Sequence, residues 1–315
     1  TANVFVNKGI NSNGNAIFNL NAGLPLSSDI SWIYVADFNG DGLDDILLSN
    51  RVRKSWGDPD KLTATIHLSQ LGPTGALSFK PYQTPTVYIP HSLIDTHLIG
   101  DYFGTGKCSI LIQSETSYTT FNSMLMTYDA TNDRFRLKNF VESLSANRFY
   151  PADYNGDGIT EILYKKEDGS TGIVQVQSTS NGSYRFVETY SGAPTHWSDC
   201  FPGDYNGDGL IDALFYSPSS ATPWTIHLSN QLGISIVSFA LPETFPYSSL
   251  GDYLFSLDQP NHTSQFIKVA DFDGNGCSDL GLFHDNVFYV FYGPLRSSDD
   301  SAPFANSQRI SVQHL

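Results

Sequence analysis

DYNGDGLID, residues 204–212, decides the fold of this chain, because its nine-residue pattern returns along the whole length. The other intact copies are DFNGDGLDD (37–45), DYNGDGITE (153–161) and DFDGNGCSD (271–279), and a reduced copy is DYFGTGKCS (101–109). The first residues of successive copies lie 51 to 67 residues apart. A pattern that returns at intervals of this length indicates a repeat architecture.

Each intact copy has oxygen-bearing side chains at positions 1, 3, 5 and 9, and glycines at positions 4 and 6 that let the backbone turn tightly. Calcium takes about six to eight oxygens, from carboxylates, amides, backbone carbonyls and water. By analogy with other loops of this spacing, position 7 is expected to offer its backbone carbonyl, so its side chain is free to vary. The sequence therefore predicts four Ca²⁺ sites. The expected ligands are Asp37, Asn39, Asp41, Leu43 and Asp45; Asp153, Asn155, Asp157, Ile159 and Glu161; Asp204, Asn206, Asp208, Leu210 and Asp212; and Asp271, Asp273, Asn275, Cys277 and Asp279.

The reduced copy at 101–109 serves as an internal control. It keeps Asp101 and both glycines, but Phe103, Thr105 and Ser109 stand at ligand positions and Lys107 adds a positive charge. We expect the structural unit there without the metal. An EF-hand is excluded for the intact copies, because its bidentate acid at position 12 is replaced by apolar residues: Leu48, Tyr164, Phe215 and Leu282.

Short apolar runs flank every loop, and without helical periodicity they are typical of buried strands. A second hairpin is expected in each repeat, at 65–79, 124–137, 172–186, 225–239 and 286–293. Four strands per repeat match one propeller blade. We predict an all-β fold, a β-propeller of four-stranded blades, with five or six blades favoured over seven.

The domain prediction is a single propeller over residues 1–315, with repeats starting near 31, 95, 147, 199 and 266. Residues 1–30 contain an orphan hairpin without a loop before it. This hairpin belongs either to an incomplete blade of a chain excised from a longer protein or to a ring-closing blade completed by the C-terminal segment 309–315.

The loop pattern resembles the FG-GAP or VCBS repeats of integrin α-subunit propellers and many bacterial secreted proteins. That resemblance covers about Trp32 to Tyr292 and implies a calcium-binding propeller. It is weak for function, because such repeats occur in adhesins, lectins and toxin subunits and as appendages of enzymes. Tyrosine-rich repeats of the GDYNGDG type also look, more loosely, like those in B components of bacterial Tc-type toxins.

Composition fits an extracellular calcium module. The net charge is −15, and the four loops contribute twelve acidic ligands, so four bound calcium ions would reduce the net charge to −7. There is no basic stripe to neutralise phosphates, which argues against a nucleic-acid partner, and no 18-residue apolar run that could span a membrane. The missing initiator Met suggests a processed or trimmed chain, and no signal peptide is evident. Cys108, Cys200 and Cys277 have no close pair and are expected to be buried thiols.

Catalytic motifs are absent, and the carboxylates of the loops are committed to calcium. We expect a non-catalytic binding or scaffolding module of a bacterial secreted or surface protein, in protein interaction, adhesion or toxin assembly. Two alternatives are a carbohydrate-binding lectin and a propeller enzyme acting on polysaccharide. Trp56 and Trp224, in the links between the second and third strands, are candidate ligand contacts; the competing interpretation is that they pack between blades. The sequence leaves the ligand, the blade number and the oligomeric state open.

Overall fold

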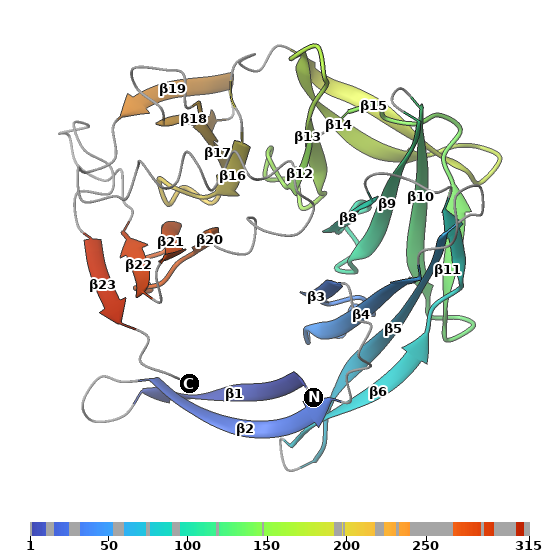
Figure 1. Ribbon diagram of the computed structural model, residues 1–315, viewed down its shortest axis with the longest axis horizontal. Helices are drawn as coiled ribbons and strands as arrows, with labels where there is room; N and C mark the ends of the chain where they lie inside the picture. Colours follow the sequence, from blue (N-terminus) through green and yellow to red (C-terminus); the bar gives the residue numbers. More distant parts are fainter. Residues whose placement is uncertain are drawn as a thin grey trace. The chain divides into compact units, whose positions relative to one another are not determined.

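The computed structural model shows an all-β chain (Figure 1). It describes residues 2–10, 16–24, 32–52, 60–73, 76–89, 95–117, 120–146, 148–191, 197, 199–217, 224–230, 233–239, 267–284, 287–292 and 307–311. Sheets of four consecutive antiparallel strands repeat along the chain, as the predicted β-propeller requires.

Each acidic loop joins the first two strands of one sheet, which confirms the predicted strand–loop–strand unit. The first sheet contains β3 (Trp32–Ala36), β4 (Asp45–Val52), β5 (Asp60–Leu71) and β6 (Leu77–Gln83), with β7 (Val87–Ile89) also paired to β5. The second contains β8 (Asp95–Gly100), β9 (Ser109–Ser117), β10 (Thr120–Asp129) and β11 (Arg134–Asn139). The third contains β12 (Arg148–Ala152), β13 (Glu161–Lys165), β14 (Thr171–Ser178) and β15 (Tyr184–Ser191). The fourth contains β16 (Asp199–Gly203), β17 (Asp212–Tyr216), β18 (Trp224–Asn230) and β19 (Gly233–Phe239). The fifth contains β20 (Ile267–Ala270), β21 (Asp279–His284), β22 (Val287–Phe291) and β23 (Ser307–Ser311).

The two ends of the chain differ in how they are paired. β1 (Ala2–Ile10) and β2 (Ala16–Leu24) form a two-stranded antiparallel sheet of their own. β23, which overlaps the C-terminal segment 309–315, pairs with β22 as the fourth strand of the last sheet (Figure 1). Residues 312–315 lie outside the described residues, so both alternatives for the N-terminal hairpin remain predictions.

The chain divides into two compact units. One unit comprises Thr1–Ser145 and Val176–Val187, and the other comprises Ala146–Gln175 and Glu188–Leu315. The core of the first unit is an aliphatic and aromatic cluster around Phe38, Ile66 and Ile110, none of which is more than 1% exposed. In the second unit, Trp197 packs against Phe215 with the ring centroids 5.0 Å apart. Among the residues that the structure describes, no helix has the length and apolar character needed to cross a membrane.

Strand register explains why the residue before each loop is small. In the fourth sheet Gly203 pairs with Asp212, the last residue of the loop. A Cβ at Gly203 would lie 2.6 Å from Val269 Cγ1 and 2.9 Å from Ser278 Cβ, on the next sheet. The same register pairs Ala36 with Asp45 and Ala152 with Glu161. A small residue at this point therefore allows neighbouring sheets to approach closely where the loops begin.

Candidate metal sites in the repeated loops

The aspartate at position 1 closes each loop with hydrogen bonds to the backbone. Asp204 Oδ1 accepts from the N–H of Gly207 at 2.7 Å, and its Oδ2 accepts from the N–H of Gly209 at 2.9 Å. The other three intact loops repeat both bonds. Gly207 and Gly209 have φ values of 75° and 89°, a backbone conformation that side chains with a Cβ rarely adopt. The two glycines therefore let the loop fold around its first carboxylate.

Positions 3 and 5 turn their side-chain oxygens back onto the loop. Asn206 Oδ1 accepts from the N–H of Asp208 at 2.9 Å, and Asp208 Oδ1 accepts from the N–H of Leu210 at 2.8 Å. The first and third loops contain the same two bonds. Each accepting oxygen has a second lone pair, which leaves it able to bind a cation as well.

The carboxylate at position 9 is buried, and it ties the loop to the sheet. Asp212 is 0% exposed and accepts from the N–H groups of Tyr205 at 2.9 Å and Ser229 at 2.8 Å. Asp45 repeats the arrangement with Phe38 and Ser69. Ser229 belongs to β18, so this one carboxylate connects the loop with the second hairpin of its sheet.

Burial raises the pKa of these carboxyl groups. The pKa of Asp212 rises to about 7 because burial removes the charge from water, while its backbone donors oppose the shift and Asp208 and Asp204 add to it. The same causes, led by burial, raise the pKa of Asp45 to about 6 and that of Glu161 to about 7. A bound cation would offset this effect of burial, because a nearby positive charge stabilises the charged form of the carboxyl group.

Two of the four predicted acid sets come together in space. The carboxylates of Asp153, Asp157 and Glu161 offer oxygens within 4.8 Å of one another, and so do those of Asp271, Asp273 and Asp279. Counting all five loops in chain order, with the reduced copy second, these are the third loop (153–161) and the fifth loop (271–279). Among the described residues, the acids of the first loop (37–45) and the fourth loop (204–212) do not form such a group, although both loops keep the hydrogen bonds described above. The chemistry fits a hard cation in both grouped loops, because all the side-chain donors are oxygens and the carboxylates would otherwise repel one another.

The reduced loop at 101–109 shows what the first aspartate does without the other ligands. Asp101 Oδ2 accepts from the N–H of Gly106 at 2.6 Å, and its Oδ1 accepts from that of Thr105 at 3.1 Å. Asp101 thus makes the same kind of turn that the intact loops make. The first aspartate has a structural role in the turn, separate from any role as a ligand.

The remaining predicted site residues fall into two groups. The backbone carbonyls of Leu43, Ile159, Leu210 and Cys277 remain predicted ligands, since no contact of theirs tests the prediction. Trp56 lies outside the described residues, and Trp224 begins β18 without a described side chain. None of the three cysteines is in a disulfide; Cys200 and Cys277 are buried and Cys108 is half-buried.

A cationic pocket in the first unit was missed by the sequence reasoning. An open pocket of about 530 Å³ is lined by Thr84 and Pro85 and by β11, whose exposed Arg134, Arg136 and Lys138 alternate along the strand. Alternate residues of a strand face the same side, so the segment RFRLK could have shown this arrangement.

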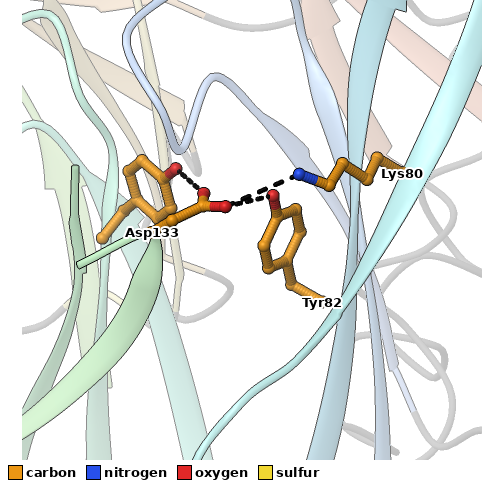
Figure 2. Close-up of polar contacts among 4 residues, drawn as sticks. Lys80, Tyr82 and Asp133 are labelled. Atoms are coloured by element: carbon orange, nitrogen blue, oxygen red, sulfur yellow. Dashed lines mark hydrogen bonds and ion pairs between the residues drawn. The ribbon is translucent and has the colours of Figure 1, made fainter. Parts of the chain in front are cut away.

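An ionic network joins β6 to Asp133, in the turn between β10 and β11. Asp133 directly precedes Arg134, which lines this pocket. Figure 2 shows the carboxylate of Asp133 facing both Lys80 and Tyr82. Lys80 Nζ lies 3.5 Å from Asp133 Oδ2, and Tyr82 Oη donates to the same oxygen at 2.9 Å. Tyr128 Oη donates to the other oxygen, Oδ1. These contacts connect the outer strands of the first two sheets.

Repeated four-stranded sheets, each with a glycine-rich loop between its first two strands, define a β-propeller. A family model described as an FG-GAP-like repeat matches residues 153–215, from the start of the third loop into β17. The match covers residues 153–215 alone, and the four-stranded sheets before and after them have the same strand–loop–strand arrangement. The sheets show a β-propeller, and a propeller with an FG-GAP-like repeat suggests a binding or scaffolding role. A comparison with curated proteins finds no match.

Proposed function

We propose that this propeller is a non-catalytic binding module that works outside the cytosol and is stabilised by four calcium ions. The observation that carries the proposal is the grouping of three carboxylates within 4.8 Å in the third and fifth loops, with one member of each group buried. The first and fourth loops have the same residue types and the same turn, which supports sites there too. Calcium would hold each loop closed, while the chain supplies the oxygens and fixes their positions.

The stabilising effect of calcium can be worked out. Extracellular modules bind calcium with dissociation constants of ~10⁻⁴–10⁻³ M. At ~1 mM calcium, each site would then add roughly 0.4–1.4 kcal/mol to the free energy of unfolding, and four independent sites roughly 2–6 kcal/mol. Thermal unfolding in 2 mM calcium and in excess chelator tests this directly, with magnesium as the control. An unchanged melting temperature in chelator would reject a stabilising role.

The proposed partner is a protein, in adhesion or in the assembly of a toxin or a larger surface protein. The proposed contacts are Trp56, in the link that follows the second strand of the first sheet, and Trp224, the first residue of β18 in the fourth sheet. A pull-down with wild type and with Trp56→Ala, Trp224→Ala and the double variant tests them. Capture of the same partner by wild type and the double variant alike would remove these tryptophans from the binding surface.

A second candidate function, a lectin for acidic sugars, is favoured by the pocket along β11. Arg134, Arg136 and Lys138 line one open pocket in a chain of net charge −15, and of these three Arg136 is in a salt bridge with Asp129. Carboxylated or sulfated sugars offer the complementary charge. A glycan array read with wild type and with Arg134→Ala/Lys138→Ala separates the two functions, because only the lectin predicts binding to acidic sugars that the double variant loses.

A further inference from the structure

The loops of neighbouring sheets are hydrogen-bonded to each other in a repeated way. In the first unit, the N–H of Cys108 donates to the carbonyl oxygen of Asp37 at 2.7 Å. In the second unit, the N–H of Ser278 donates to the carbonyl oxygen of Asp204 at 2.6 Å. In both pairs, position 8 of the following loop binds position 1 of the preceding loop. In each pair the donor therefore directly follows position 7 of its loop, so the bond holds position 7 close to the preceding loop.

The side chain at position 7 of the following loop lies on the position-4 glycine of the preceding loop. A Cβ built on Gly156 would clash with Leu210 Cδ2. A Cβ built on Gly40 would lie 2.7 Å from Lys107 Cγ and 2.8 Å from Lys107 Cε. The two contacts are equivalent in the repeat, but one uses an apolar side chain and the other a lysine.

Lys107 thus carries its charge from the reduced loop onto the first intact loop. Its hydrocarbon chain crosses the backbone at Gly40, and the ammonium group is one bond beyond Cε. Gly40 lies between Asn39 and Asp41, two of the predicted ligands of the first loop. A positive charge held there repels a divalent cation and partly neutralises the carboxylates when no metal is bound.

We propose that Lys107 lowers the calcium affinity of the first loop, making it the weakest of the four sites. This inference rests on the proposed calcium function. For an ammonium group and a divalent ion taken to be about 7 Å apart in water, Coulomb's law gives a repulsion that corresponds to about a two- to sevenfold loss of affinity, greatest at low salt. The third loop escapes this effect, because Leu210 occupies the equivalent position above it.

Lys107→Leu and its reciprocal, Leu210→Lys, test the inference as a matched pair. Calcium is titrated calorimetrically into the full chain at 20 mM and 500 mM sodium chloride. Lys107→Leu should tighten the weakest binding step by about two- to sevenfold at low salt and by less at high salt. Leu210→Lys should weaken one step by a similar factor, while Lys107→Arg, which keeps the charge, should match wild type.

Asp41→Ala assigns the effect to the first loop. This variant should bind one ion fewer, and adding Lys107→Leu to it should change nothing further. Four ions bound with the weakest step unaltered by Lys107→Leu, or an equal effect in the Asp41→Ala background, would overturn the inference and leave the calcium function standing. No calcium binding by wild type would overturn both.

Discussion

Replacing Asp212 by alanine tests the role of the buried carboxylate at position 9. The side chain is 0% exposed and accepts from two backbone N–H groups, that of Tyr205, which is buried, and that of Ser229, which is part-buried. Without it, both N–H groups lose their acceptor, and each buried unsatisfied donor costs about 1–3 kcal/mol. Burying the charged carboxylate itself costs folding free energy, as the raised pKa of Asp212 shows. Removing the carboxylate also removes that cost, so the lower part of the range of about 1–3 kcal/mol applies to each donor. We expect Asp212→Ala to lower the free energy of unfolding by about 2–4 kcal/mol even in excess chelator.

Asp208→Ala is the matched control in the same loop. Asp208 is exposed, and its main backbone contact is the N–H of Leu210, which water can reach. In chelator this variant should lose less than about 1 kcal/mol, because a solvated donor regains a hydrogen bond to water. In calcium both variants should also lose the contribution of one metal site, roughly 0.4–1.4 kcal/mol.

Urea unfolding followed by tryptophan fluorescence, in 2 mM calcium and in chelator, measures all four values. The reasoning would be refuted if the two variants were equally stable in chelator, since position 9 would then have no structural role beyond binding the ion.

Two further predictions concern side chains that are not predicted metal ligands. His97 is buried against Trp32 and Tyr34, and burial, with Arg51 nearby, lowers its pKa to about 4. The folded protein holds His97 neutral, so its contribution to the free energy of unfolding should be complete above the unfolded pKa of about 6.5 and should fall by about 3 kcal/mol at pH 4. In urea unfolding from pH 7 to 4, His97→Phe should therefore lose less stability than wild type. Parallel stability curves for the two proteins would contradict this. Burial also raises the pKa of Cys108, to about 11, and that of Cys200, so the native protein should react slowly with a thiol reagent at pH 8 and denatured protein should show three thiols; rapid modification of native Cys200 would contradict its burial.

The fold was predictable because the loop motif recurs once per four-stranded sheet. Aspartates and glycines at fixed spacing mark the turn between the first two strands, and apolar runs on either side mark the strands. A small residue before each loop was visible in the sequence, but its reason, close approach of the next sheet at Gly203, required the three-dimensional register. Likewise, sequence alone could not decide which strand β23 joins, because a five-residue segment such as SQRIS can pair with several sheet edges.

The candidate site was predictable in its residues more than in its geometry. Spacing identified the oxygen donors, but only the structure shows that the carboxylates of the third and fifth loops come within 4.8 Å of one another. Asp101 shows the limit of ligand counting, because its carboxylate is explained by hydrogen bonds to Thr105 and Gly106. The contact of Lys107 with Gly40 is between two repeats, so the sequence of neither repeat alone predicts it.

The number of calcium ions bound per chain tests the central claim most directly. The full chain is dialysed against a large excess of 2 mM calcium, and the bound metal is measured by native mass spectrometry and by elemental analysis. Four ions per chain are expected, falling to three in Asp157→Ala and remaining at four in Asp101→Asn, because Asp101 belongs to the loop without the other ligands. Zero or one ion per chain in the wild-type protein would contradict the account.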